Sequence, residues 1–451
     1  MKSLLERRFQ SRFYVPLVLA IWIFMPEIRR IVDWRSSFHA LTLLSIVPLL
    51  SLLPGIFLLP AAWAKLSFGF RRVAAVWLIA FGYALAVAIL NHSLLSALYS
   101  AAQFGMPILF GVLLIGSNAR DASTLYQRLA NSLLVMMTIS ALYGIFQYVA
   151  PPAWDVYWAQ QADVEASQGE TVAFGFRIFG TLNSTGPFSS TLLLTLLLNL
   201  PRLDVRRWYV SAAFVPLLIA LALTSVRSCW IGLAVGLVVY GIFAAGRLRA
   251  ASAFTLLIIA FVGISAVISY TVPSAEVAFT TLNARINSLS ELQYDHSADV
   301  RKQETAEALS DSLEQPLGLG LGTVGTSAKL STTGSTISLD NGFLARLVEM
   351  GFAGFALYAI AIIMAIAVAF KAHGVSKRAG NLFDADACAA VIAVQFVLLS
   401  LEAASDAHLG FSGMIFWAIV ALSSGLLSDK VGYVRAAFSY PPLTRTSAVS
   451  P

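Results

Sequence analysis

Four arginines of this sequence have the chemistry to bind an anionic group: Arg177, Arg227, Arg285 and Arg301. Arginine is permanently charged, and its planar fork of N–H donors matches phosphate oxygens. Arg227 lies in the short stretch TSVRSCW between two apolar runs, and a charge at membrane depth is costly and usually functional. Together the four predict a site for a diphosphate-like group. Each one taken alone is equally explained by contacts with lipid headgroups or with a nearby acid.

Two acids around residue 340 are candidates for proton transfer. The segment SLDNGFLARLVEMGFAG covers residues 338–354 and contains Asp340 and Glu349. A carboxylate such as Asp340 can accept the proton of a sugar hydroxyl or orient that hydroxyl. The alternative for Asp340 is a helix N-cap. Glu349 has a simple partner in Arg346, three residues before it.

The glycine-rich run PLGLGLGTVG, residues 316–325, has the composition of a nucleotide-binding loop but lacks the motif of such a loop. It contains no GxxxxGK[ST] signature and follows no strand. Because glycine has no Cβ, Gly320 and Gly322 are expected to let the backbone pass close to another element or a ligand. The two cysteines lie in or beside apolar runs and the five histidines are scattered, so no metal site is expected.

The elements that must position these residues are membrane spans. Hydrophobic residues make up 58% of the 451 positions and charged residues 12%, about half the ~25% of soluble domains. The apolar runs are continuous and about as long as a bilayer is thick. This pattern excludes an ordinary soluble enzyme, a disordered chain and an alternating β-barrel. The fold class is therefore an all-α polytopic membrane protein.

About twelve transmembrane helices are expected, because ~20 apolar residues cross a bilayer. The expected spans are residues 14–30, 40–62, 73–91, 94–117, 125–149, 182–200, 208–225, 228–246, 252–272, 342–370, 387–404 and 410–428. With the N-terminus in the cytoplasm, alternating spans place most lysines and arginines inside and most acids outside, as the positive-inside rule requires. The poorest fit is the group Arg29, Arg30 and Arg35 after the first span.

A single integral membrane domain is expected over residues 1–430, with both termini in the cytoplasm. Two loops on the outer side, at about 150–181 and 273–341, are too long to be simple turns. The second lies between spans nine and ten, and residues 298–314 within it have the pattern of an amphipathic helix. Residues 431–451 are polar and contain proline and serine, so a disordered cytoplasmic tail is expected there.

Four segments, in this order, resemble the O-antigen ligase/polymerase superfamily. They are RIFGTLNSTGPFSSTLLL, TSVRSCWIGLAVGL, VRKQETAEALSDSLEQPLGLGLG and SLDNGFLARLVEMGFAGFALY. The family pattern has an arginine-and-glycine segment before a span, then an arginine-containing turn. A large periplasmic loop follows, with an arginine-led helix, a Pro-x-Gly-x-Gly stretch and a His-Asn or Asp-Asn pair that enters the next span. The resemblance covers about residues 175–360, and the expected topology agrees over the rest.

The resemblance implies an inverting glycosyltransferase with a GT-C-like fold in the bacterial inner membrane, independent of metal, nucleotide sugar or any other cofactor. Its donor would be an oligosaccharide on undecaprenyl diphosphate, transferred to an acceptor glycan at the periplasmic face. Carried over by position, the four arginines would hold the diphosphate, and Asp340 and Arg301 would be catalytic. Acceptor binding or structural support would come from Asn341, Glu349, Gly320 and Gly322.

The residue type at position 340 indicates which branch of the superfamily this sequence is more similar to. In the ligases, the residue at this place resembles a histidine. The Asp-Asn pair of this sequence is more similar to the pattern of the polymerase and exopolysaccharide branches. We therefore expect a surface polysaccharide polymerase of the O-antigen type. The alternatives are an O-antigen ligase that joins polymer to the lipid A-core of lipopolysaccharide, and a protein oligosaccharyltransferase.

A secondary transporter or lipid flippase is the alternative from another class, because twelve spans with basic inner loops suit it equally well. Transporters often carry ionisable groups near the midplane, whereas here the spans hold few such charges and the chemistry is concentrated in one outer loop. For the transferase, a chain-length regulator is a candidate partner, and no nucleic-acid partner is expected.

Overall fold

The computed structural model of the chain describes residues 11–39, 42–63, 66–91, 94–116, 122–162, 171–203, 207–246, 296–330, 339 and 341–439. The expected span 252–272, Arg285, Asp340 and residues 440–451 lie outside the described residues.

The described residues are folded predominantly into helices. In chain order these are α2 (Ser11–Ser36), α3 (Leu43–Leu50), α4 (Pro54–Trp63), α5 (Phe68–Leu90), α6 (Leu94–Gly105), α7 (Pro107–Gly116), α8 (Ala122–Val149), α9 (Ala153–Gln161), α11 (Thr185–Asn199), η1 (Leu200–Arg202), α12 (Trp208–Leu223), α13 (Arg227–Phe243), α16 (His296–Glu314), η4 (Gly325–Leu330), α17 (Gly342–Arg378), α18 (Leu382–Glu402) and α19 (Gly410–Ser439). The helix expected at 298–314 is confirmed as α16.

Helices occupy the expected spans wherever the chain is described. Within the described residues, seven segments are long and apolar enough to cross a membrane, and α12 and α13 are shorter apolar helices. Two expected spans are broken: 40–62 consists of α3 and α4, and 94–117 of α6 and α7. The second helix of each pair begins at a proline, which removes a backbone donor and clashes with the preceding turn. The count of about twelve spans therefore stays a prediction.

The last helix is longer than expected. Residues 431–439, expected to be part of a disordered tail, continue α19 to Ser439. Polar and proline-containing composition favours a tail without structure, but the prolines of this region lie at Pro441, Pro442 and Pro451, beyond the helix end. The segment before them contains no proline, and its one poor helix former, Gly432, lies within α19. Residues 431–439 are therefore helical, in contrast to the expectation.

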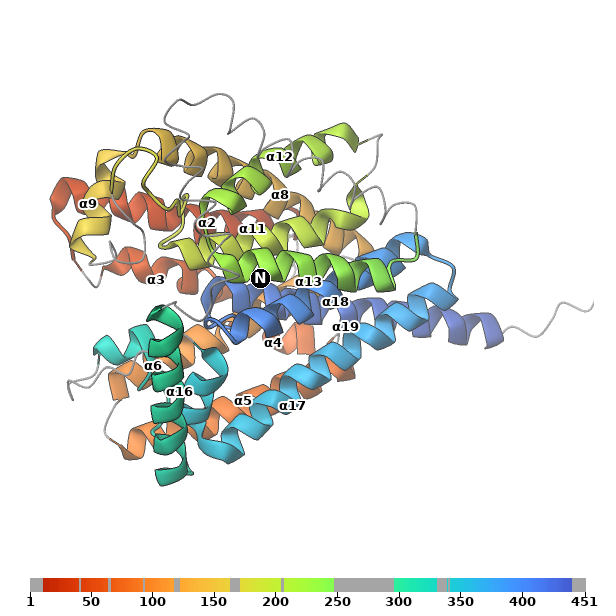
Figure 1. Ribbon diagram of the computed structural model, residues 1–451. Coiled ribbons are helices and arrows are strands. Elements are labelled where there is room, and N and C mark those ends of the chain that lie inside the picture. Colours follow the sequence, from red (N-terminus) through yellow and green to blue (C-terminus); the bar gives the residue numbers. More distant parts are fainter. Residues whose placement is uncertain are drawn as a thin grey trace, which may run out of the picture.

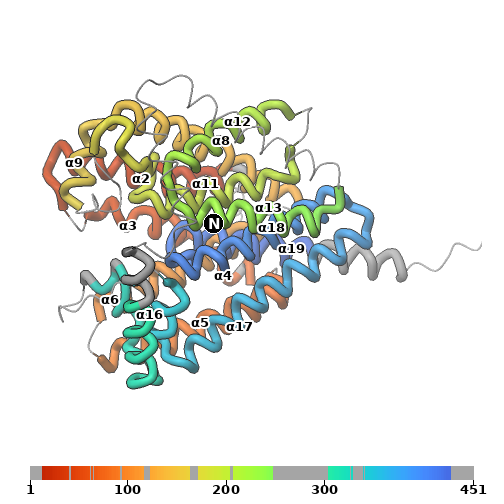
Figure 2. The backbone as a smooth tube through the Cα atoms, viewed as in Figure 1, coloured from red at the N-terminus to blue at the C-terminus, as the bar shows by residue number. Residues whose placement is uncertain are grey.

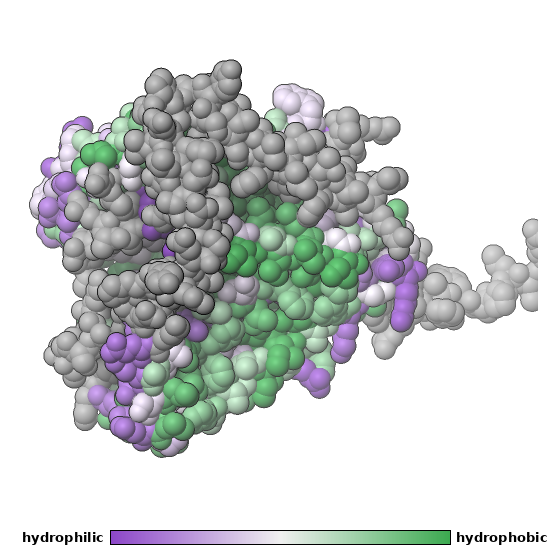
Figure 3. Space-filling model, in the orientation of Figure 1, coloured by the Kyte–Doolittle hydropathy of each residue, from purple (hydrophilic) through white to green (hydrophobic). Residues whose placement is uncertain are grey.

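The helices form three groups along the bundle (Figure 1). One side consists of α2, α8, α11, α12 and α13, while α5 and α17 pack together on the other side, and α18 and α19 lie between them. α16 packs on α17 and lies across the direction of the long helices, as the tube in Figure 2 also shows. Large apolar side chains such as Ile79, Ile231 and Ile363 remain exposed, and Figure 3 shows an apolar band with polar residues toward its ends. The chain is a multi-pass membrane protein.

The first residue of α17 lies beside the last residue of α18. The two helices are joined by residues 379–381 and run antiparallel, and a Cβ added to Gly342 would lie 2.6 Å from Glu402 Oε1. We call this end of the helical bundle the Gly342 end. It is where the loop that follows α16 returns to the long helices.

Arg227, the first residue of α13, lies at the Gly342 end as well. α13 packs antiparallel to α18: a Cβ on Gly232, near the start of α13, would lie 3.9 Å from Leu401 Cδ2. At the opposite end, Asp386 Oδ1 accepts a hydrogen bond from Ala245 N at 2.7 Å. The sequence alone did not require the arginine turn and the start of α17 to share an end; the antiparallel packing produces it.

Buried ion pairs explain why the first span fits the positive-inside pattern poorly. Arg30 is fully buried, and its Nε lies 2.7 Å from Asp155 Oδ1 of α9 while Glu27 pairs with the same guanidinium. Arg29 pairs with Asp33 at 3.3 Å. Burial raises the pKa of Asp155, and the charge of Arg30 opposes that rise. Two of the three exceptional arginines are thus neutralised locally, and they are not free charges of a loop.

The glycine segment, residues 316–324, is inserted into a break in α17. Gly351 interrupts the helix with φ 60° and ψ −175°, a region that is essentially restricted to glycine. The backbone N–H of Leu319 donates to the carbonyl of Val348 at 2.9 Å, and that of Gly320 donates to the carbonyl of Glu349 at 3.0 Å. The glycine segment therefore satisfies carbonyls that the helix break leaves open.

We expect Gly351→Ala to lower the stability of the protein by about 2–6 kcal/mol, from backbone strain of ~1–3 kcal/mol and a steric overlap of similar size. A Cβ at this position would lie 2.3 Å from the carbonyl oxygen of Pro316. Thermal unfolding of the detergent-solubilised chain measures the effect. Gly374→Ala is the matched control, because it lies in the same helix with nothing within 4 Å of the added Cβ. An unchanged Tm for Gly351→Ala would contradict the role of the break.

Candidate active site

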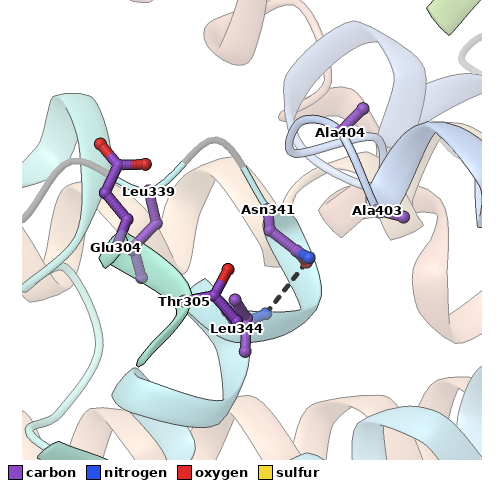
Figure 4. Close-up of a pocket in the computed structure, with 7 residues that line it drawn as sticks. All are labelled: Glu304, Thr305, Leu339, Asn341, Leu344, Ala403 and Ala404. Atoms are coloured by element: carbon purple, nitrogen blue, oxygen red, sulfur yellow. Dashed lines mark hydrogen bonds between the residues drawn. The ribbon is translucent and has the colours of Figure 1, made fainter. Parts of the chain in front are cut away.

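A cavity of about 180 Å³ opens at the Gly342 end, between α16, the start of α17 and the turn that joins α18 to α19 (Figure 4). Its wall combines polar side chains with short aliphatic ones. The lining residues are Glu304, Thr305, Leu339, Asn341, Leu344, Ala403 and Ala404. Three elements far apart in the sequence thus meet around one small volume.

Asn341 closes the cavity from the start of α17 and is the N-cap of that helix. Its Oδ1 accepts hydrogen bonds from Phe343 N at 3.0 Å and Leu344 N at 3.2 Å. The cap considered for Asp340 is therefore wrong: the helix begins one residue later, and the asparagine caps it. Asp340 itself lies outside the described residues, but both of its chain neighbours, Leu339 and Asn341, line the cavity.

Arg301 belongs to the helix that forms the opposite wall. It precedes Glu304 and Thr305 on α16 by three and four residues, and both of these line the cavity. Positions three and four apart share one face of a helix. Arg301 therefore lies in register with the cavity-lining face of α16, and its side chain lies outside the described part of the structure.

The structure brings Arg177 and Arg227 together at the start of α13. Arg177 donates from Nε to the carbonyl of Thr224 and from Nη2 to the carbonyl of Ser225, both at 3.2 Å. Arg227 follows two residues after Ser225, whose φ of 55° turns the chain from α12 into α13. Both arginines are half-buried. The turn therefore concentrates two permanent positive charges at the Gly342 end.

Glu349, Gly320 and Gly322 are placed as supporting residues. Glu349 is fully buried, pairs with Arg346 as the sequence spacing indicated, and accepts from the backbone N–H of Gly322 at 2.8 Å. A Cβ on Gly320 would lie 2.5 Å from Ala88 Cα. The expectation that these glycines let the backbone approach another element closely is confirmed.

A buried polar cluster behind the cavity was not expected from the sequence. Glu402 is fully buried at the end of α18; Tyr358 Oη donates to its Oε1 at 2.8 Å, and His408 Nδ1 lies 2.9 Å from its Oε2. Arg346 Nη2 donates to Asp406 Oδ1 at 3.3 Å and so links α17 to the α18–α19 turn. Burial raises the pKa of Asp406, and the charge of Arg346 opposes that rise. An ionisable residue at the end of an apolar run was the available signal.

The cluster fixes the wall of the cavity rather than lining it. Ala403 and Ala404 follow Glu402 directly, and the backbone N–H of Ala407 donates to Glu402 Oε2 at 2.7 Å. The carboxylate of Glu402 therefore organises the turn that carries both alanines. Among the described residues, no group of three or more His, Cys, Asp or Glu side chains has the geometry to hold a metal ion.

The arrangement can bind a small polar group in the cavity and an anion at the same end of the bundle. Asn341 and Glu304 offer hydrogen-bonding groups, and the turn with Arg177 and Arg227 offers positive charge at the same end.

Comparison with known proteins supports the motif-based resemblance. No curated protein sequence matches the chain. Residues 212–359 match the family model described as O-antigen ligase, and this range runs from α12 through the beginning of α17, including Arg227, α16, the glycine segment and Asn341. Residues 212–359 of this membrane protein are therefore similar to the O-antigen ligase family, which supports the resemblance to the O-antigen ligase/polymerase superfamily.

Proposed function

We propose that the protein is an inverting glycosyltransferase that polymerises oligosaccharide repeat units carried on undecaprenyl diphosphate at the periplasmic face of the inner membrane. The observation that carries the proposal is the shared position of the cavity and the Arg177–Arg227 pair at the Gly342 end. A transferase needs an acceptor site and an anion site side by side. The family match adds that such chains act in O-antigen ligation or polymerisation.

In the proposed reaction, a hydroxyl oxygen of the acceptor sugar attacks the anomeric carbon of the donor sugar. The carboxylate of Asp340 takes the hydroxyl proton, the new glycosidic C–O bond forms, and the bond between the anomeric carbon and the diphosphate oxygen breaks. The diphosphate leaves with the bonding electron pair. Its growing negative charge is stabilised by the fixed guanidinium groups of Arg177 and Arg227, together with Arg285 and Arg301.

An O-antigen ligase that transfers finished polymer to lipid A-core is the second candidate function. The specific observation in its favour is the description of the matching family model. The ligases of the superfamily resemble one another in having a histidine at this place. The aspartate at position 340 therefore favours the polymerase. Both reactions use the same donor chemistry, so the two candidates differ in the acceptor alone.

A deletion strain separates these functions through its glycan profile. We expect single repeat units to accumulate on the carrier lipid and long polymer to disappear, because polymerisation consumes repeat units to make polymer. Accumulation of long polymer on the carrier, with none on lipid A-core, would identify a ligase. Unchanged surface glycans would contradict both the polymerase and the ligase function and would favour the transporter or flippase alternative.

Complementation with Asp340→Asn tests the proposed base in the same strain. The substitution keeps the size of the side chain and removes its ability to take a proton, so transfer is expected to fall by about 10²–10⁴-fold. Wild-type polymer at wild-type protein level would show that another group is the base.

A further inference from the structure

The polar groups that line the cavity at the Gly342 end indicate which class of acceptor sugar it can bind. We propose that it is the subsite for one non-acidic sugar ring of the acceptor glycan, held by the amide group of Asn341 and the carboxylate of Glu304. The inference rests on the proposed transferase function and names the acceptor class for that site.

The orientation of the Asn341 side chain is fixed by its role as a cap. Its Oδ1 must face the helix, because it accepts from the backbone N–H groups of Phe343 and Leu344. The two N–H donors of Nδ2 are therefore directed elsewhere, and within the described part of the chain no acceptor for them is found. A lining residue with a fixed pair of donors is suited to a ligand hydroxyl oxygen.

Glu304 supplies the complementary acceptor from α16. Its side chain is half-buried and lines the cavity, and among the described residues nothing donates a hydrogen bond to its carboxylate. Figure 4 shows Glu304 and Thr305 on one side of Asn341, with Ala403 and Ala404 on the other. An ionised carboxylate accepts hydrogen bonds only, so one hydroxyl of a sugar ring can donate to Glu304 while the oxygen of another accepts from Asn341.

The size and charge of the cavity narrow the ligand class. Its volume of about 180 Å³ lies below the ~300–1,000 Å³ of sites for drug-sized ligands, so it fits one ring rather than several. Ala403 and Ala404 leave room for that ring, and Leu339 and Leu344 offer an apolar surface to its C–H face. A carboxylate in the wall disfavours a uronic acid, because like charges brought together are costly. Neutral and amino sugars remain.

The test measures acceptor kinetics of the full-length protein in lipid nanodiscs. The donor is the lipid-linked repeat unit isolated from the deletion strain at a fixed concentration, and the varied acceptor is the same glycan released from its carrier lipid. Asn341→Asp keeps the cap, since aspartate is an equally good N-cap, but removes both N–H donors. Glu304→Gln keeps the shape and removes the charge. For each variant we expect the KM for the acceptor to rise about 10-fold or more, with a smaller change in kcat and an unchanged Tm.

Glu307→Gln is the matched control for Glu304→Gln. It makes the same chemical change on the same helix, but Glu307 is exposed, accepts from Gln303 at 2.9 Å and does not line the cavity. Its acceptor KM is expected to equal that of the wild type. Free glucuronic acid is the second probe: it should inhibit Glu304→Gln more strongly than the wild type.

The outcomes separate this inference from the function on which it rests. Wild-type transfer with unchanged acceptor KM in both Asn341→Asp and Glu304→Gln would overturn the sugar subsite and leave the transferase intact. No transfer by the wild type would instead remove the proposed function. Equal rises in KM for Glu304→Gln and Glu307→Gln would assign the effect to the charge of α16 and would also overturn the subsite.

Discussion

Transfer of repeat units is expected to fall by about 10²–10³-fold when Arg227 is replaced by alanine, the usual cost of losing one fixed donor that stabilises a departing oxyanion. Arg227 begins α13 at the Gly342 end, two residues after Ser225, whose carbonyl accepts a hydrogen bond from Arg177. Arg227→Lys should recover only part of the rate, because an ammonium is a point charge without the planar fork. Polymer length in the complemented deletion strain and initial rates in nanodiscs measure the effect.

The control for this prediction is an arginine at the other end of the bundle. Arg378→Ala removes the same charge from the last turn of α17 and is expected to leave transfer unchanged. Arg177→Ala should also reduce transfer, and less than additively with Arg227→Ala, because Arg177 holds the turn before Arg227 through two carbonyls. Full activity of both single variants at normal protein level would remove the proposed diphosphate site.

Arg346→Met is expected to destabilise the protein by about 3–5 kcal/mol, because it leaves buried acids without their partner. Arg346 is 2% exposed; it pairs with Glu349 and also donates to Asp406 at 3.3 Å. The loss should appear as a lower Tm of the detergent-solubilised chain. Adding Glu349→Gln to Arg346→Met should restore part of the stability, since the uncompensated charge is then removed.

A double variant no more stable than Arg346→Met would contradict this electrostatic account. It would place the cost in the lost packing instead, because the Arg346 guanidinium also lies 4.4 Å from the centre of the Phe104 ring. Arg346→Lys separates the two explanations further. Lysine retains the positive charge but has no planar group to stack on the ring.

The positions of the long helices follow from hydropathy, but their breaks do not. The breaks before Pro54 and Pro107 have a local signal, since proline begins the second helix of each pair. The break at Gly351 has no such signal, because it depends on hydrogen bonds with residues 316–320. A long-range partner decides the local conformation, and a window of sequence around Gly351 contains no information about that partner.

Charge counting misjudged the first helix for the same physical reason. Counting charges along the sequence places Arg30 after the first span, whereas the structure buries it against Asp155, more than a hundred residues later in the chain. The pairing of Arg346 with Glu349 was predictable, because i and i+3 are neighbours on any helix. The choice between Asp340 and Asn341 as cap was not, since both residue types cap well and only the start of the helix distinguishes them.

The candidate site was predictable as a set of residues and not as a geometry. Motif order pointed to Arg177, Arg227, α16 and the start of α17, and the structure places all of them at the Gly342 end. Glu304 and the buried polar cluster around Glu402 could not be predicted from the sequence, because their roles come from packing across helices. Nothing in the spacing of Glu402, Asp406 and His408 indicates that they meet Tyr358 and Arg346.

The pairing of the glycine segment with the early helices has a consequence for synthesis in the cell. Asn91 Nδ2 donates to the carbonyl of Leu319, 228 residues further on, and Leu321 N donates to the carbonyl of Ala84. At roughly 5–20 residues per second, the ribosome needs about 10–45 s to supply these partners. The C-terminal end of α5 must wait for that time before these hydrogen bonds can form. A chain released before residue 321 can therefore insert its early helices, but it can never complete this end of the molecule.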